Sequence, residues 1–369
     1  MIEPDHLCHR FDRERPMTVG LEEELMVLDP ATLDLAPRAR ELLAALGDDA
    51  RAKSELPEAQ LELLSTPSTT VAGAAAQLAG ARRDLAAAAA GRLRLAGGGA
   101  HPFAAPEGPL NPAPRYAAMR DEFGPMARRQ LVFGLHVHVA VGGCDRALAV
   151  YNALRSHLPE LAALGANAPY HGGGDTGLAS VRPTICATLP RQGVPPAFAT
   201  WAELAGTMAW GRRAGALPEP RLWWWELRLH PLHGTVEVRV PDAQGTVWET
   251  AALGAVVHAL VADLARRHDA GEALPVAPTW RIEENRWSAL RHGLDGTLAD
   301  LVTGEPASTR ERLDALLERL RPAAHEVGCE AELATAQRLA ECNGAQRQRE
   351  AAAGDPHAAI AWLAGRFLA

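Results

Sequence analysis

The chain has 369 residues, of which 47% are apolar and 22% charged, so it has ample apolar mass for a folded core. Its formal net charge is -8 and no stretch is rich in Lys and Arg, which argues against a nucleic-acid-binding protein. Its five cysteines are widely spaced without a Cys-x-x-Cys pair, so neither a disulfide framework nor a structural zinc site is indicated. The N-terminus lacks a signal-peptide pattern, and charged residues or His interrupt every long apolar stretch. We expect a cytoplasmic protein that spans no membrane.

The N-terminal half of the chain alternates strands and helices. In chain order, the sequence predicts a strand over 18–29, a strand over 60–64, a helix over 71–95, a helix over 115–129, a strand over 131–141 and a helix over 145–165. Thr69 or Thr70 is expected to cap the first helix and the glycines at 97–99 to stop it. Asp145 is expected to cap the last helix.

A loop and a helical region follow. The Gly- and Pro-rich segment 167–196 is long enough to be a functional loop, where we expect substrate contacts. Paired strands are predicted at 222–229 and 235–240, then a helix over 247–268, and helices from 283 onward with breaks near 304–306, 322 and 354–356. We assign residues 1–369 to one domain, with a sheet-forming core at about 18–268 and a helical part at about 279–369.

Four of the strand segments carry acids or imidazoles at alternate positions, which places them on one face of each strand. The sets are Glu22 with Glu24; Glu58, Gln60 and Glu62; His136 with His138; and Glu237 with Arg239. One such strand alone is most often a half-exposed strand with its polar face in solvent. Four faces rich in carboxylate and imidazole would repel one another without a cation, so the pattern indicates bound metal.

Carboxylates with one or two imidazoles and no thiolate suit Mg²⁺, or alternatively Mn²⁺, which share oxygen ligands with phosphate groups. Arg239 shares a face with Glu237 and could contact phosphoryl oxygens through its fork of donors. Considered alone, this strand fits an Arg–Glu salt bridge within the sheet equally well.

Several segments in a fixed order resemble the type 2 glutamate-cysteine ligase family of carboxylate-amine ligases. They are VGLEEE at 19–24, the run 58–67, GLHVHV at 134–139, DTGLASVR at 175–182 and TVEVRVPD at 235–242. The match extends from about residue 18 to 344–347, and the spacing of Glu237, Arg239 and Asp242 also resembles a strand of glutamine synthetase. The resemblance implies an α+β fold with a curved antiparallel, glutamine-synthetase-like sheet that forms the active-site cleft, backed by helices, with a helical C-terminal part.

The resemblance also implies the reaction and its residues. ATP and Mg²⁺ would activate a glutamate-like carboxylate as an acyl phosphate, which cysteine or another amine attacks. The implied metal ligands are Glu22, Glu24, Glu62, His136 or His138, and Glu237. The implied contacts to phosphates or to the substrate carboxylate are Arg182, Arg228 and Arg239, and we expect catalysis to depend on Arg239, Arg182 and Glu237.

Some residues fall outside the shared pattern. The loop GGGAHPF at 97–103 lacks a P-loop pattern, and His101 within it is a candidate nucleotide contact. Ala140 and Leu178 replace residues that relatives commonly carry, which suggests an atypical substrate pocket. His171 and Lys53 are expected on the surface. The tryptophans at 223–225 are expected in core or sheet-edge packing.

Three alternative functions remain open from the residues. A phosphotransferase acting on an amine or guanidine uses the same metal and arginine equipment, and a metal-dependent amidohydrolase also uses His-x-His on a strand. A nucleotide or metal sensor could retain the fold without turnover. We expect small-molecule substrates, no nucleic acid or membrane partner, and a homodimer.

Overall fold

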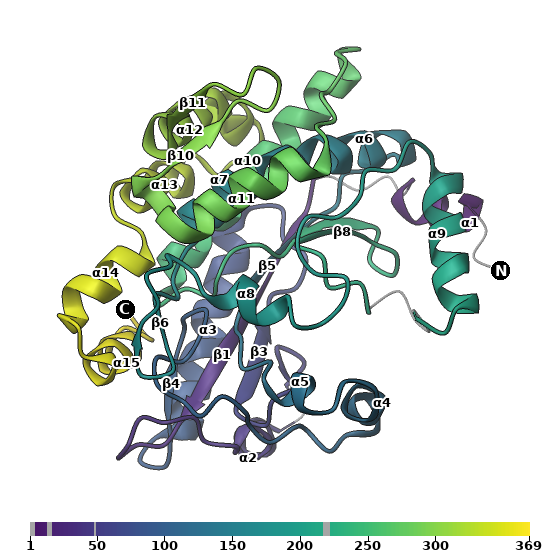
Figure 1. Cartoon of the computed structure of the whole chain (residues 1–369). Helices are drawn as coiled ribbons and strands as arrows, with labels where there is room; N and C mark the ends of the chain where they lie inside the picture. The colour runs from purple at the N-terminus through teal and green to yellow at the C-terminus, as the bar shows by residue number, and fades with distance from the viewer. Residues whose placement is uncertain (1–3, 13–16, 48, 217–221) are drawn as a thin grey trace.

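A computed structural model describes residues 4–12, 17–47, 49–216 and 222–369 (Figure 1). Its centre is a seven-stranded sheet whose main path runs in the order β2-β3-β1-β5-β9-β8, with β4 paired to β1. The bounds in that order are Ala52–Ser54, Gln60–Leu64, Val19–Leu28, Leu135–Val139, Thr235–Val238 and Leu227–His230, with β4 at Arg94–Ala96. All its pairings are antiparallel. The fold is α+β around an antiparallel sheet, which confirms the predicted class.

The sheet register aligns the polar residues of neighbouring strands. Glu22 of β1 lies opposite His136 of β5, and Glu24 lies opposite Glu62 of β3. His138 of β5 lies opposite Glu237 of β9. Because directly opposed residues point to the same face, these side chains gather on one side of the sheet. The intervening residues, among them Leu21, Leu25, Leu61, Val137 and Val236, are buried in the main hydrophobic core.

Helices cover the apolar face of the sheet. The long helix α10 (Val247–Asp269) packs against α3 (Val71–Ala89), α6 (Cys144–Leu154), α12 (Thr309–Val327) and α13 (Glu330–Glu341). A side chain at Gly254 of α10 would come within 3.0 Å of Leu21, so glycine permits the helix to lie close on β1. In length and composition α10 could cross a membrane, but 89% of the apolar window is buried inside the fold, as in a core helix.

Smaller elements surround this framework. The further helices are α1 (Pro4–Phe11), α2 (Ala39–Leu46), α4 (Pro114–Phe123), α5 (Pro125–Arg128), η1 (Arg155–His157), α7 (Leu158–Leu164), α8 (Arg182–Cys186), α9 (Trp201–Arg213), α11 (Thr279–His292), η3 (Gly293–Asp295), α14 (Gly344–Ala352) and α15 (Pro356–Gly365). Two small hairpins pair β6 (Tyr170–His171) with β7 (Gly174–Asp175), and β10 (Thr297–Ala299) with β11 (Pro306–Ser308).

Several element boundaries differ from the prediction. The helix predicted over 71–95 is capped by Thr70 as expected but ends at Ala89, and β4 occupies its predicted end. The helix predicted over 115–129 breaks at Gly124, where a positive φ ends α4 before Pro125 begins α5. Pro322 lies inside α12 and does not end it.

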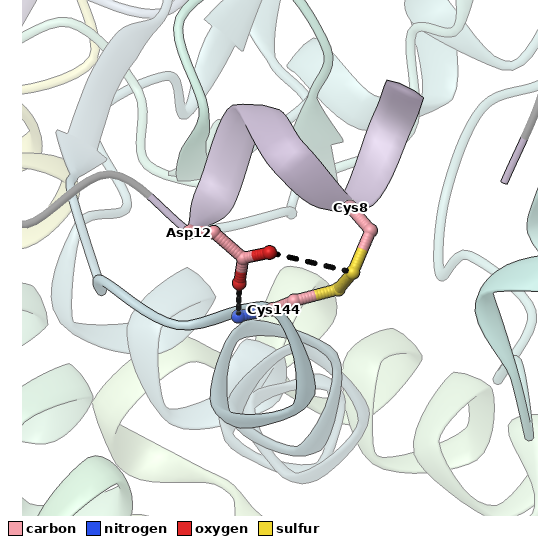
Figure 2. A group of neighbouring side chains, drawn as sticks. All are labelled: Cys8, Asp12 and Cys144. Atoms are coloured by element: carbon pink, nitrogen blue, oxygen red, sulfur yellow. Dashed lines mark hydrogen bonds between the residues drawn. A yellow bond between two sulfur atoms is a disulfide. The ribbon is translucent and has the colours of Figure 1, made fainter. Parts of the chain in front are cut away.

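The chain contains a disulfide, which corrects the expectation drawn from cysteine spacing. Cys8 of α1 is bonded to Cys144 at the first turn of α6, 136 residues away in sequence (Figure 2). Their Cα atoms lie 5.1 Å apart, within the usual range for a bridged pair. Spacing could not reveal the pair, because tertiary packing of two distant helices brings the sulfurs together. The remaining cysteines, Cys186, Cys329 and Cys342, are free.

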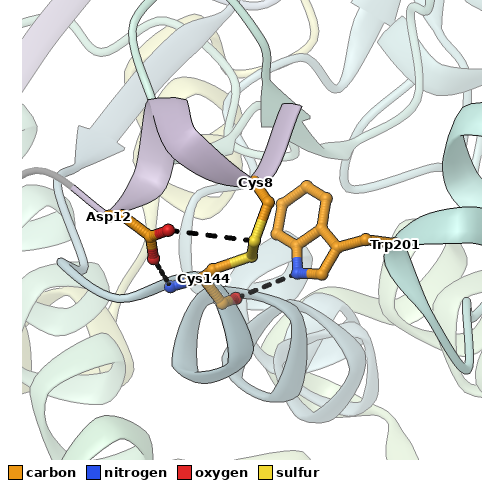
Figure 3. The surroundings of a disulfide bond; sticks show 4 residues. All are labelled: Cys8, Asp12, Cys144 and Trp201. Atoms are coloured by element: carbon orange, nitrogen blue, oxygen red, sulfur yellow. Dashed lines mark hydrogen bonds between the residues drawn. A yellow bond between two sulfur atoms is a disulfide. The ribbon is translucent and has the colours of Figure 1, made fainter. Parts of the chain in front are cut away.

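Polar and aromatic contacts reinforce this junction. Asp12 Oδ1 accepts a hydrogen bond from the Cys144 N–H at 2.8 Å, so the cap of α6 comes from the N-terminal segment and not from Asp145. Trp201 of α9 donates from Nε1 to the Cys144 carbonyl at 3.2 Å (Figure 3). Its ring also lies against Phe11, with centroids 5.0 Å apart. The disulfide therefore lies in an ordered contact among α1, α6 and α9.

Candidate active site

A cavity of about 300 Å³ opens on the polar face of the sheet. Its floor contains Glu22, Glu24, Glu62, His136 and Arg228 from four of the strands, and Arg239 directly after β9. Residues of α4, α8 and α11 and of the segments around 192 and 224 form the walls. The alternation of polar residues seen in the sequence therefore forms the base of a real pocket.

Two groups of candidate metal ligands share Glu22. The first combines Glu22, Glu62 and His136, and the second combines Glu22, His138 and Glu237, each with its ligand atoms within 4.8 Å of one another. In the first group, His136 Nδ1 is 3.4 Å from Glu22 and 3.5 Å from Glu62. In the second, His138 Nε2 is 3.5 Å from Glu22 and 3.7 Å from Glu237. Both imidazoles thus lie at metal-ligand positions, whereas the sequence left the choice between them open.

The orientation of His138 fits a metal ligand. Its Nδ1 shares a 2.9 Å hydrogen bond with the Thr235 hydroxyl, while its buried Nε2 has no hydrogen-bond partner among the described residues. A bond at one ring nitrogen fixes the imidazole so that the other is presented to an ion. Two carboxylates face that nitrogen, and an oxygen-rich set with one imidazole suits Mg²⁺ or Mn²⁺. The residues present therefore fit the implied cation.

Electrostatics favours the ionised form of the two carboxylates in the second group. Burial would lower the pKa of His138, but Glu237 and Glu22 outweigh it and raise that pKa, so a cation bound there would displace a proton from the imidazole. Burial alone would raise the pKa of Glu237, but Arg228 and Arg239 reverse this and hold that pKa well below its ordinary value. The pKa of Glu22 is likewise held low, because its two histidine neighbours outweigh burial. Burial, with help from Arg239, lowers the pKa of His136 to about 3. The carboxylates are therefore ionised and His136 is neutral near pH 7.

Glu24 differs from the other acids. It is half-buried, and loss of solvation together with the nearby Glu55 raises its pKa to about 7. The backbone N–H of Gly134 donates to its carboxylate. Glu24 belongs to neither ligand group, although it shares the cavity floor with Glu22. Its predicted role as a metal ligand therefore stays a prediction.

Three arginines predicted to bind phosphate or substrate have different environments. Arg239 Nη1 donates to Glu237 at 2.6 Å and borders the cavity. Arg228 also pairs with Glu237 and donates from Nη1 to the Trp223 carbonyl at 3.1 Å. Arg239 therefore forms the ion pair with Glu237 and also lines the cavity, so the two interpretations of this strand do not exclude each other.

Arg182 has a largely internal role. Its Nε donates to Asp242 at 2.9 Å, and its Nη2 donates to the carbonyls of Arg239, Val240 and Pro241. Asp242 is fixed in turn by the Ser180 hydroxyl and by the Asn167 N–H. Arg182 lines the cavity, but these bonds leave mainly Nη1 for a ligand. It anchors the end of β9 and presents one edge to the site.

His101 lies outside the residues that line the cavity. Its Nε2 bonds to the Leu33 carbonyl at 2.8 Å, and its Nδ1 accepts from the Ala104 N–H at 2.9 Å. Both ring nitrogens therefore hold loop backbone, and we leave His101 out of the proposed site. Ala140 and Leu178 also lie outside the cavity lining, so the departures at these positions do not shape it.

Several functional candidates were missed in the sequence. Lys53, expected on the surface, lies in the cavity wall paired with Glu62, because the three-residue strand β2 sets it opposite Glu62. Glu226 and Arg286 form a partly buried two-bond ion pair at 2.7 and 2.6 Å in another wall. A three-residue strand and a pair 60 residues apart leave no periodic signal.

A buried anchor supports the strand that carries Glu22 and Glu24. Glu23, on the opposite face of β1, accepts two 2.7 Å hydrogen bonds from Arg82 of α3. Arg82 also donates to the carbonyls of Gln244, Gly245 and Phe367. Both side chains are essentially fully buried. This five-residue set, which we call the Arg82 anchor, fixes β1 from behind.

Comparison with known proteins gives the family. A profile of Glutamate-cysteine ligase family 2 (GCS2) matches residues 18–358. A Rubrobacter xylanophilus protein named "Putative glutamate--cysteine ligase 2-3" is 41% identical over 347 residues, 92% of this chain and 93% of that protein. A Micrococcus luteus protein named "Putative glutamate--cysteine ligase 2" is 37% identical over 354 residues, 92% of this chain and 89% of that protein.

Solved structures share the fold. The glutamate–cysteine ligase of Francisella tularensis, crystallised in complex with AMP, matches with a TM-score of 0.69 at 11% identity, covering 97% of this chain and 89% of that one. A bifunctional glutathione synthetase from Pasteurella multocida matches with a TM-score of 0.66 at 14% identity, covering 99% of this chain and 53% of that one. The chain belongs to glutamate-cysteine ligase family 2 and is an ATP-dependent carboxylate-amine ligase.

Proposed function

We propose that the protein joins glutamate, or a closely similar carboxylate, to cysteine or another small amine through an acyl-phosphate intermediate. The observation that carries the proposal is the ligand set around Glu22, bordered by Arg239 in a cavity large enough for small substrates. The names of the relatives support glutamate as the acid and cysteine as the amine.

The proposed reaction has two steps. A substrate carboxylate oxygen takes the γ-phosphoryl group of ATP, which releases ADP and converts a poor acyl donor into a reactive mixed anhydride. The amine nitrogen then attacks the acyl carbon, the C–O bond to phosphate breaks, and an amide and inorganic phosphate leave. The attacking ammonium must first lose a proton to a nearby base. Both steps depend on positioning and on neutralising phosphoryl charge.

Residues of this chain supply that environment. Arg239, fixed by Glu237, presents its guanidinium to the cavity, where it would bind phosphoryl oxygens. Arg228 and Arg182 hold Glu237 and the β9 end in place and offer further positive charge. Glu22, Glu62, His136, His138 and Glu237 would hold Mg²⁺ or Mn²⁺, with Glu24 beside them. When bound, the cation would neutralise phosphate charge and polarise the transferred group.

The test is release of ADP and phosphate from Mg²⁺-ATP with glutamate and a panel of amines, each alone and combined. We expect release only when acid and amine are both present. An ATP phosphotransferase would need the amine alone, and an amidohydrolase would need no ATP. Amide product identified by mass spectrometry completes the assignment. ATP binding without release across a broad panel would favour a sensor and contradict the proposal.

A matched pair of variants locates the reaction. Glu22→Gln removes the acid shared by both ligand groups and is expected to lower kcat/KM by about 100-fold or more, the scale seen when one group that stabilises transition-state charge is removed. Glu58→Gln changes an acid outside the cavity lining that pairs with Arg40, and should retain activity. Equal activity of both variants would show that the reaction does not take place in this cavity. The expected homodimer is measured separately by light scattering at assay concentration.

A further inference from the structure

Part of the cavity lining is apolar, although the reaction requires only polar groups. Its apolar lining consists mainly of Leu56, Met119, Leu189, Leu222 and Trp224. Carboxylate activation, phosphoryl transfer and amine attack all use charged or polar atoms, which the floor of the cavity supplies. An apolar wall must therefore contact a part of a substrate that does not react.

Only the middle residue of the tryptophan run faces this wall. Trp223 is 5% exposed and stacks on Phe198, and Trp225 packs against the same core with its ring centroid 4.9 Å from that of Trp223. Trp224, between them, lies instead among the residues that line the cavity. The expectation of core packing thus holds for the outer two tryptophans and fails for the central one.

The Trp224 ring is held on two sides. Phe123 of α4 meets it edge to face with ring centroids 5.9 Å apart. The Arg191 guanidinium carbon lies over it, 5.2 Å from the centroid. Arg191 has a φ of 60°, which residues other than glycine rarely adopt, so the loop keeps an unfavourable backbone conformation at this contact.

The backbone beside Trp224 is also fixed. Arg191 Nε donates to the Leu222 carbonyl at 3.0 Å, and the Glu226 N–H donates to the Gly193 carbonyl at 3.0 Å. The Glu226 side chain is held by Arg286. The segment is therefore tied to the neighbouring loop on both sides of Trp224, which makes its ring a pre-formed contact surface.

We propose that Trp224 is a specificity-determining residue that packs its ring against a planar apolar group of a substrate. This inference rests on the proposed ligase function, and it adds the class of group that the cavity selects. Two sources carry such a group: the purine base of the nucleotide, or an aromatic side group on the amine. Stacking on the indole face would favour either over a substrate that lacks the ring.

The experiment compares Trp224→Ala and Trp224→Phe with Trp280→Ala, whose indole is 65% exposed on α11 and outside this cavity. In the nucleotide arm, calorimetry measures the affinities for Mg²⁺-ADP and for Mg²⁺-pyrophosphate, which lacks the base. In the amine arm, kcat/KM is compared for 2-phenylethylamine and ethylamine, which differ by the ring. If the wild type turns over neither amine, their binding is measured by calorimetry instead.

If the base is the source, Trp224→Ala weakens Mg²⁺-ADP about tenfold and leaves pyrophosphate unchanged. If the aromatic group of the amine is the source, Trp224→Ala lowers the preference for 2-phenylethylamine over ethylamine by about tenfold. Trp224→Phe should restore much of either effect, and Trp280→Ala should show neither. Wild-type behaviour of Trp224→Ala in both arms would overturn the proposal. Absent turnover in the wild type would count against the ligase substrates, while the binding measurements would still decide the role of Trp224.

Discussion

Breaking the Cys8–Cys144 disulfide should destabilise the protein substantially. The bond closes a loop of 136 residues, and the chain-entropy relation for a loop of that length gives about 5 kcal/mol at 25 °C. We treat this as an upper value, because the Asp12–Cys144 hydrogen bond and the Phe11–Trp201 contact remain after reduction and continue to hold α1. Equilibrium urea unfolding, followed by circular dichroism with and without dithiothreitol, measures the difference.

The variants Cys8→Ser and Cys144→Ser should match the reduced wild type and show no further response to dithiothreitol. Cys329→Ala, a change at a buried free thiol, should keep the full response of the wild type to reductant. If reductant leaves the urea midpoint of the wild type unchanged, the chain-entropy reasoning is refuted for this loop. A loss confined to a local contact around α1, with the global midpoint intact, would refute it as well.

Three further outcomes are expected. Arg82→Met should lower the free energy of unfolding by about 3–5 kcal/mol in urea titrations, because it leaves the buried Glu23 carboxylate without its ion-pair partner. The double variant Arg82→Met with Glu23→Leu should recover much of that loss. Thr235→Val should weaken Mn²⁺ binding about 10- to 100-fold in calorimetry, because it removes the hydroxyl that orients His138, whereas Thr235→Ser keeps that hydroxyl and should retain the affinity. Equal Mn²⁺ affinities of the two variants would contradict this role. Burial lowers the pKa of His157 to about 3, and nearby arginines act in the same direction, so the folded state binds fewer protons than the unfolded state below pH 6.5. The contribution of this residue to the free energy of unfolding is therefore present above pH 6.5 and is lost towards pH 3, by up to about 1.4 kcal/mol per pH unit. Denaturation curves taken across this pH range should show that a His157→Gln variant lacks this part of the pH dependence.

The sequence predicted the residues of the site better than their partners. Alternation alone placed Glu22, Glu62, His136 and Glu237 on polar faces, and the antiparallel register then brought those faces together. The bounds of β3 also match the predicted strand, because Leu61 and Leu63 alternate with Gln60 and Glu62, and Ser65 to Pro67 end it.

What escaped prediction depends on contacts between distant segments. The cap of α6 comes from Asp12 across 132 residues, so the local signal at Asp145 was misleading. Lys53 is drawn into the cavity by a three-residue strand that no periodicity marks. Pro322 stays within α12, where the tertiary packing of the helix overrides the local cost of proline.

The Arg82 anchor bears on how the chain folds as it is synthesised. It connects β1 to carbonyls at 244, 245 and 367, so its last hydrogen bond can form only when residue 367 has emerged from the ribosome. Until then the buried guanidinium lacks part of its set of acceptors, and the strand that presents Glu22 and Glu24 lacks its full support. A nascent chain stalled before residue 367 should therefore expose β1 to proteolysis more readily than the released chain.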